Sequence, residues 1–192
     1  PGVSGMRALV VLAVLAAGPA VADTDPVVES HAICIARVVA GFEADLALSG
    51  TDWDLVHRDR VRFCGTLGIV ACDRRDDAVA CKLGLAEAQQ AMRDAVLASL
   101  PAPEAVAGRD PLWSDRAYPR VWAVAHGSNA GPDCAGADDD YASWCAAHQA
   151  NLKLAQAVSL WQMARLLGVA GSAVEAGWAM EPPPPMPVRR PE

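Results

Sequence analysis

Six cysteines are the residues with the most distinctive chemistry in this chain of 192 residues. They stand at Cys34, Cys64, Cys72, Cys81, Cys134 and Cys145. An even number of cysteines in an exported chain is typical of disulfide bonds. The simplest arrangement has two disulfides among the four cysteines of the first half and a third between Cys134 and Cys145. The spacing of the four cysteines in the first half does not determine which of them pair with each other. On a continuous helix, however, Cys64 and Cys72 would be about 12 Å apart, which is too far for a disulfide.

Two histidines offer a metal-binding alternative for the same cysteines. His31 and Cys34 form an H-x-x-C pair, and Cys145 and His148 form a C-x-x-H pair. Together they would supply the Cys2His2 ligand set of zinc. The usual finger spacing is missing, and the two pairs lie far apart in the sequence. We therefore predict disulfides and no cofactor, with zinc as the alternative.

Acidic residues form a second candidate metal site. Asp133 and the run 138–140 carry the oxygen ligands that calcium prefers, but they lack the spacing and the glycine of an EF-hand loop. Acidic side chains in the first turn of a helix are stabilised by the helix dipole. This explanation of the run is the simpler one, so we predict no metal site here.

No catalytic motif stands out. The sequence lacks G-x-S-x-G, H-E-x-x-H, a P-loop and C-x-x-C. Neighbouring acids, Glu43 with Asp45 and Asp52 with Asp54, could serve a glycoside hydrolase only if they faced one cleft. Helix capping explains them more simply. We predict that the protein is not an enzyme, and a cell-wall hydrolase is the less favoured alternative.

Tryptophan dominates the aromatic residues, with six Trp against two Tyr and two Phe. Trp is favoured at protein contact surfaces and also fills cores well. Trp53 and Trp161 lie on apolar stripes and are predicted to be buried. Trp113 and Trp122 flank Pro119, and we predict that they contact a partner.

The elements that must position these residues are helices. Strand-like alternation is nearly missing, whereas apolar residues recur at helical spacing. The pattern predicts an all-α fold, a small disulfide-stapled bundle of helical hairpins. The predicted helices span residues 26–48, 53–64, 78–100 and 140–167. Gly65 and Gly68 are expected to weaken the second helix, and Pro119 to interrupt a helix that starts at Asp110. Asp25 can cap the first helix, and Gly168 fits a C-terminal cap.

The N-terminal segment has the pattern of a secretory signal peptide. Arg7 precedes the apolar run 8–17, and Ala20-Val21-Ala22 matches a cleavage site. We expect residues 1–22 to be the signal peptide, with residues 1–5 as extra N-terminal residues. Cleavage would remove one cation and no acid, so the net charge would change from −7 to about −8. The expected location is a bacterial periplasm or the outside of the cell, with no membrane-spanning segment after cleavage.

The remaining chain divides into four predicted regions. They are a Cys-rich helical half at 23–100, a linker with short helices at 101–139, a C-terminal helical half at 140–180, and a Pro-rich disordered tail at 181–192. The acidic balance argues against a nucleic-acid partner.

The cysteine pattern resembles that of a known family. Cys64 and Cys72 form a C-x7-C segment, Cys81 opens a long helix, and Cys145 opens another in the second half. This arrangement is similar to the LprI-type, lysozyme-inhibitor-like, Cys-rich periplasmic proteins. The resemblance implies a periplasmic helical protein that inhibits a lysozyme-like cell-wall hydrolase.

Taken together, these features predict an exported helical protein that binds another macromolecule. An acidic surface suits a basic partner, such as a cell-wall hydrolase, and would speed their encounter. The alternative is a non-catalytic structural or stress-related envelope protein, which would use the Pro-rich tail to bind its partner.

Overall fold

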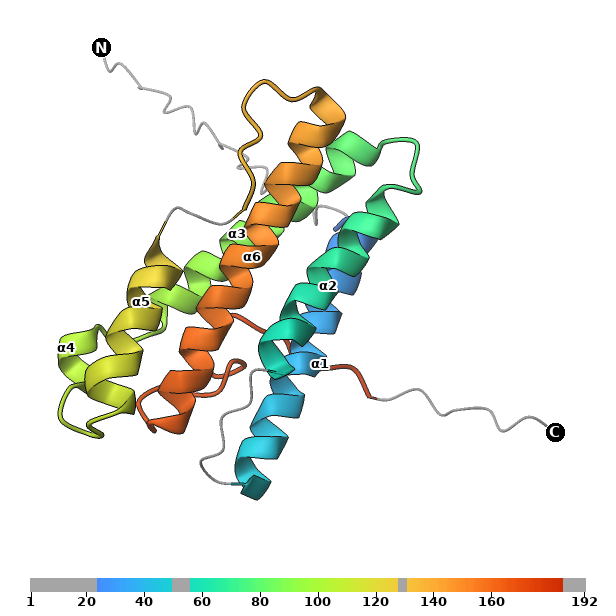
Figure 1. Ribbon diagram of the computed structural model, residues 1–192. Coiled ribbons are helices and arrows are strands. Elements are labelled where there is room, and N and C mark those ends of the chain that lie inside the picture. Colours follow the sequence, from blue (N-terminus) through green and yellow to red (C-terminus); the bar gives the residue numbers. More distant parts are fainter. Residues whose placement is uncertain (1–23, 50–55, 128–130, 185–192) are drawn as a thin grey trace, which may run out of the picture.

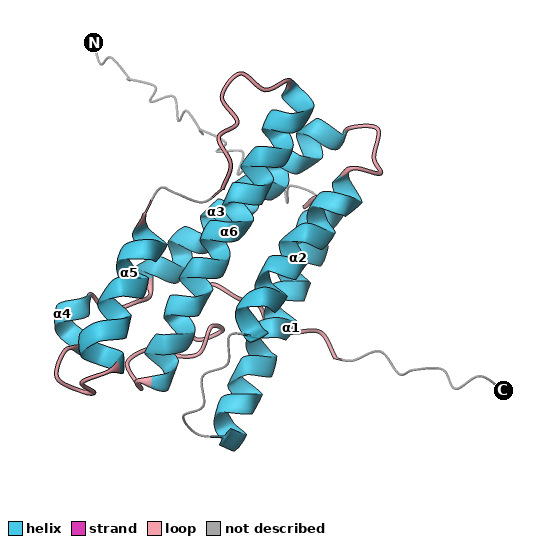
Figure 2. Cartoon of the chain, in the orientation of Figure 1, coloured by secondary structure: helices cyan, strands magenta, loops and turns pink. Residues whose placement is uncertain are grey.

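The computed structural model describes residues 24–49, 56–127 and 131–184, and these fold as an all-α protein (Figure 1). The predicted signal peptide, the region around Trp53 and the tail beyond residue 184 lie outside the described residues. The predicted all-α class is confirmed (Figure 2). The elements are α1 (Pro26–Ser49), α2 (Val56–Cys72), α3 (Ala78–Ala98), α4 (Pro103–Val106), the π-helix η1 (Trp113–Ala117), α5 (Tyr118–His126) and α6 (Asp139–Leu166).

The four long helices form a bundle in which α2 runs opposite to α1, α3 and α6 (Figure 1). Lys82 near the start of α3 bonds to Asp140 near the start of α6, so these two helices are parallel. Arg75, just after α2, bonds to Asp25, just before α1, so this pair is antiparallel. A parallel α3 and α6 require a return connection, which α4, η1 and α5 provide along the side of α6.

Helix ends follow local sequence signals. The backbone N–H of Val27 donates to the side chain of Asp25 at 2.8 Å, so Asp25 caps α1. At the end of α6, Gly168 has φ +66°. The N–H of Val169 reaches back to the carbonyl of Ala164 at 2.9 Å, as in a Schellman motif. The predicted caps at Asp25 and Gly168 are confirmed.

The predicted end of the second helix at Cys64 is wrong. Helix α2 runs without interruption through Gly65 and Gly68 to Cys72. A Cβ atom at Gly65 would lie 2.1 Å from Cγ of Asn151 on α6, and one at Gly68 would lie 2.8 Å from Cδ2 of Leu85 on α3. The two glycines lower the intrinsic helix propensity of this segment, but they allow α6 and α3 to approach α2 closely.

The connection between α3 and α6 is more helical than predicted. Residues 103–106 of the predicted linker form the short helix α4. Pro119 does not interrupt a helix, because it stands in the first turn of α5, where a missing N–H costs nothing. The side chain of Asp110 accepts from the N–H groups of Leu112 and Trp113 at 2.8 and 2.7 Å, and so caps the start of η1.

The main core surrounds the C-terminal half of α6. Trp161 is fully buried, as predicted, and lies edge-on to Phe42 and Trp178 with centroid separations of 5.4 and 5.0 Å. No single buried stripe describes the whole of α6. Tyr141 is 47% exposed, whereas residues 157–164 are buried on every side because several elements surround this part of α6.

Three disulfides staple the bundle. They join Cys34 to Cys64, Cys72 to Cys81 and Cys134 to Cys145, with Cα–Cα distances of 5.7, 5.4 and 6.4 Å. These distances are normal for disulfides. Two pairs therefore lie in the first half and one in the second, as predicted, and the structure adds the connectivity.

Among the described residues, no helix combines the length and the apolar character that crossing a lipid bilayer requires.

Candidate partner-binding surface

Trp113, one of the two predicted contact residues, lies at a surface pocket. The pocket has a volume of about 370 Å³ and lies where η1 meets the end of α6. Its other lining residues are Arg109, Asp110, Met163, Leu166 and Leu167. Trp113 is 36% exposed and its neighbour Leu112 is 58% exposed. An accessible aromatic ring over an apolar floor is a common contact point for a partner.

Trp122, the second predicted contact residue, has mainly a packing role. Its side chain is half-buried and packs against the main core. Its ring stacks on that of His126 at 4.0 Å, and His126 Nδ1 donates to the carbonyl of Trp122 at 2.9 Å. The structure therefore leaves Trp113 as the better contact candidate of the two.

The zinc alternative is not supported by the positions of its four ligands. Cys34 and Cys145 are each held in a disulfide, with Cys64 and Cys134. The ring of His148 stacks on Trp144 at 4.8 Å. Within the part of the chain that the structure describes, no three His, Cys, Asp or Glu side chains are placed to hold a metal ion.

His31 instead takes part in a buried polar contact between α1 and α3. Gln89 Nε2 donates to His31 Nε2 at 3.4 Å, and both side chains are buried. Burial lowers the pKa of His31 from 6.5 to about 4, because the charged imidazolium loses its hydration. His31 is therefore neutral at physiological pH.

Glu43, one of the neighbouring carboxylates, takes part in contacts between helices. Glu43 lies 3.6 Å from Nε of Arg165 and accepts from the N–H of Ala173 at 3.3 Å. This carboxylate thus links α1 to α6 and to the segment that follows it. Asp52 and Asp54 lie outside the described residues.

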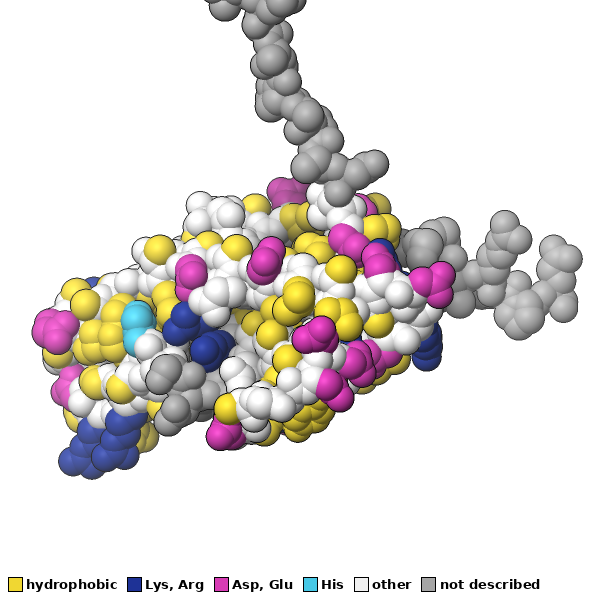
Figure 3. All heavy atoms as spheres, turned by 90° about the horizontal axis from the view of Figure 1, so that it is seen from above, with side chains coloured by type: hydrophobic (Ala, Val, Ile, Leu, Met, Phe, Trp, Pro, Cys, Tyr) yellow, Lys and Arg dark blue, Asp and Glu magenta, His cyan; other side chains and the backbone are white. Residues whose placement is uncertain are grey.

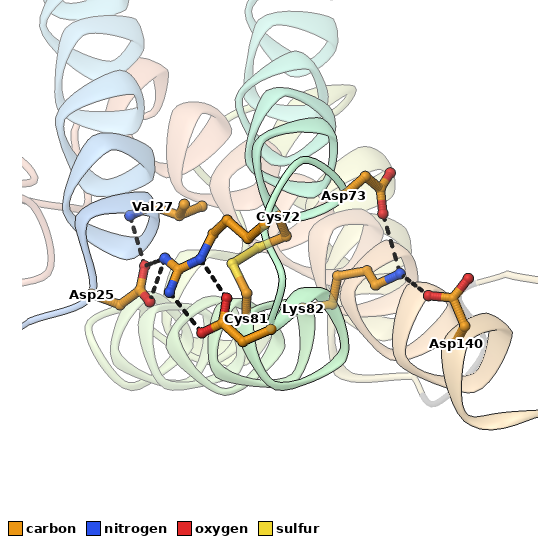
Figure 4. The surroundings of a disulfide bond; sticks show 9 residues. Asp25, Val27, Cys72, Asp73, Cys81, Lys82 and Asp140 are labelled. Carbon is orange, nitrogen blue, oxygen red and sulfur yellow. Dashed lines mark hydrogen bonds and ion pairs between the residues drawn. A yellow bond between two sulfur atoms is a disulfide. The ribbon is translucent and has the colours of Figure 1, made fainter.

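Two groups of ion pairs hold together the end of the bundle where α2 turns into α3 (Figure 4). The buried ammonium of Lys82 contacts Asp140 on α6 and lies 3.1 Å from Asp73. Desolvation lowers the pKa of Lys82, but the hydrogen bonds to Asp140 and Asp73 outweigh it and raise the pKa above its usual value. This cation joins the α2–α3 turn to the start of α6.

Arg75 joins the same turn to the start of α1. Its guanidinium bonds to Asp25 at 2.9 Å and to Asp77 at 2.7 Å. The hydrogen bond with Asp77 raises the pKa of Arg75, and the same bond lowers the pKa of Asp77. The Cys72–Cys81 disulfide closes the turn between the two groups of ion pairs (Figure 4).

Acidic side chains outnumber basic side chains at this end of the molecule. We define the acidic end as Asp25, residues 73–77, Lys82 and residues 138–140, which hold seven aspartates against Arg74, Arg75 and Lys82. Figure 3 looks onto this end from above and shows acidic side chains gathered over part of the face. Residues 138–140 are predicted from the sequence to form an acidic first turn of a helix, and the side chain of Asp138 accepts from the N–H of Tyr141 at 2.9 Å at the start of α6. The gathering of charges from three segments could not be predicted from any one of them.

An apolar strip on α2 was not predicted from the sequence. Phe63, Leu67 and Val70 are 60%, 47% and 39% exposed, and they recur at helical spacing. The spacing is visible in the sequence, but the helix was predicted to end at Cys64. A continuous helix is needed before the three side chains share one side.

Comparisons with protein-family models, with curated proteins and with solved structures found no match for this chain.

Proposed function

We propose that this chain is an exported, non-catalytic binding protein whose acidic end takes a basic partner protein. The first partner class to test is a lysozyme-like cell-wall hydrolase, in agreement with the family resemblance of the cysteine pattern. Three disulfides support export to an oxidising compartment such as a bacterial periplasm. The observation that carries the proposal is the excess of seven aspartates over three cations at one end of the bundle.

Covalent and ionic contacts hold the segments of the acidic end together before a partner binds. The disulfide fixes the α2–α3 turn, Lys82 joins it to α6 and Arg75 joins it to α1. A surface that is already ordered loses little conformational entropy on binding. A concentration of one charge on it also steers an oppositely charged protein toward it.

The test is binding and inhibition of a basic lysozyme by the exported chain. Asp76 and Asp139 are exposed, and within the part of the chain that the structure describes no side-chain hydrogen bond or ion pair holds them. We expect the double variant Asp76→Lys/Asp139→Lys to bind the lysozyme at least tenfold more weakly at low salt and to inhibit it correspondingly less. The matched control is Glu104→Lys, an exposed residue of α4, which should bind like wild type. Absence of wild-type binding, or equal loss in the control, would contradict the proposal.

A second candidate is an envelope protein that holds a different partner through the Trp113 pocket. The exposed indole beside Leu112 favours this role. In that case Trp113→Ala would reduce capture of cross-linked envelope proteins, while Asp76→Lys/Asp139→Lys would leave capture unchanged.

A further inference from the structure

A groove between α1 and α2 begins beside the acidic end and runs along the two helices away from it. It encloses about 350 Å³ beside the Cys34–Cys64 disulfide. Its lining is mostly apolar and consists of Pro26, Val27, Ser30, His31, Cys34, Cys64, Leu67, Gly68 and Ala71. A concave apolar surface of this size can receive a large side chain of a partner.

The apolar strip on α2 extends the groove onto the surface. Leu67 lines the groove and is also 47% exposed. Phe63 precedes it by one turn and Val70 follows it by one turn, on the same side of the helix. Exposed apolar side chains that join an apolar groove are typical of an interaction site rather than of scattered surface residues.

Arginines stand around this strip. Arg60 lies one turn before Phe63 on α2, and Arg74 lies in the turn that follows the end of α2 at Cys72; both are exposed. On α1, the exposed Arg37 follows Cys34 by three residues. Because Cys34 bonds to Cys64 and the helices are antiparallel, Arg37 faces the part of α2 that carries Arg60.

The carboxylates nearest to the groove do not neutralise these arginines. Asp59 lies 3.8 Å from Arg62, while Asp25 pairs with Arg75 and Asp73 with Lys82. Glu29, on α1, precedes Ser30 and points to the other side of that helix by its register. Across residues 24–49, 56–127 and 131–184, Arg37, Arg60 and Arg74 have no ion-pair partner.

We propose that the α1–α2 groove docks an acidic amphipathic helix of a partner protein. Arg60 lies twelve residues before the end of α2 at Cys72, which is about 18 Å along the helix, and Arg74 lies just beyond that end. A helix of about four turns would span this distance, with apolar side chains over Leu67 and carboxylates near the arginines at both ends. A concave floor fits the ridge of a helix better than the flat surface of a bilayer.

The groove proposal is tested with a defined peptide. The probe is an 18-residue helical peptide with leucines at helical spacing and glutamates at both ends, labelled for fluorescence anisotropy with the full chain. A peptide with lysines in place of the glutamates is the charge control. We expect the acidic peptide to bind at least tenfold more tightly than the basic one. Leu67→Glu and the double variant Arg60→Glu/Arg74→Glu should each weaken its binding at least tenfold.

Matched variants separate the groove from the rest of the surface. Leu83→Glu on α3 and Arg120→Glu on α5 change exposed residues away from the groove and should bind the acidic peptide like wild type. Circular dichroism of each variant checks that the fold is intact. Leu67→Glu should leave binding of the basic lysozyme unchanged, so the groove and the proposed function can fail independently.

Three results would overturn the proposal. One is equal binding of the two peptides, or binding that Leu67→Glu leaves unchanged. Another is that the protein binds vesicles of anionic phospholipid but not the peptide, and that Arg60→Glu/Arg74→Glu abolishes the vesicle binding. This result would assign the strip to a membrane surface. The third is a concentration-dependent dimer in sedimentation experiments that Leu67→Glu abolishes, which would assign the groove to a second copy of the chain.

Discussion

At the scale of single residues, the buried His31 is the group most sensitive to pH. Its ring meets Gln89 inside the bundle, and Oε1 of that glutamine is buried without a hydrogen-bond partner. A charged imidazolium at this place would have lost its water without gaining an opposite charge among the contacts described. Folding is therefore coupled to the neutral form of His31.

This coupling predicts a loss of stability in acid. Between pH 6.5 and about pH 4, the unfolded chain binds a proton at His31 that the folded chain excludes. The free energy of unfolding consequently falls as pH falls through this window, by about 3 kcal/mol in total. The non-titrating variant His31→Gln should lose about that much less between pH 7 and pH 4. Urea unfolding of both proteins across the range measures it, and parallel pH profiles would contradict it.

At the scale of elements, α2 depends on two glycines for its close packing against its neighbours. It contacts α1, α3 and α6, and it makes these contacts over a surface that contains two glycines. Asn151 of α6 fits against Gly65, where its Nδ2 donates to the carbonyl of Arg62 at 2.8 Å. The close packing of α2 against α6 thus depends on Gly65 having no side chain.

We predict that Gly65→Ala destabilises the protein by about 1–3 kcal/mol, although alanine is the better helix former. The added methyl would overlap the buried side chain of Asn151. Gly84→Ala is the matched control, because Gly84 also lies within a helix and nothing approaches its Cβ position within 4 Å. That variant should gain about 1 kcal/mol. Thermal and urea unfolding compare the two, and a stabilised Gly65→Ala would show that the crossing can adjust.

At the scale of the whole molecule, three disulfides and two groups of ion pairs connect separate segments of the bundle. Cys34–Cys64 joins α1 to α2 across 30 residues, and Cys72–Cys81 closes a turn of 9 residues. By the chain-entropy account, a disulfide that closes a longer loop restricts the unfolded chain more. The first should therefore contribute more to stability than the second.

The chain-entropy difference can be measured with paired alanine variants. Cys34→Ala/Cys64→Ala should lower the free energy of unfolding by about 4 kcal/mol, and Cys72→Ala/Cys81→Ala by about 3 kcal/mol. Urea unfolding of the oxidised proteins gives both values. The reverse order would indicate that the α2–α3 turn contributes more than its loop length, through the ion pairs of Lys82 and Arg75 around it.

Much of the helical architecture could be predicted from the sequence. The apolar periodicity predicted the four long helices, Asp25 and Gly168 marked two helix ends, and the even cysteine count predicted disulfides. These features are local, because they depend on residues within a few positions of one another. The predictions at Gly65, Gly68 and Pro119 were wrong because the tertiary structure accommodates these residues. The glycines stand where another helix approaches closely, and the proline stands in a first helical turn.

What only the tertiary structure decided is which distant residues meet. Local rules could not assign the partner of Cys34, the burial of α6 on every side, or the close approach of Asn151 to Gly65, because each depends on how whole helices pack. The same holds for both proposed surfaces. The acidic end gathers charges from three segments, and the groove needs α1 and α2 side by side with α2 unbroken. The sequence alone determined the helices and the chemistry of their side chains; packing determined which of those side chains share a surface.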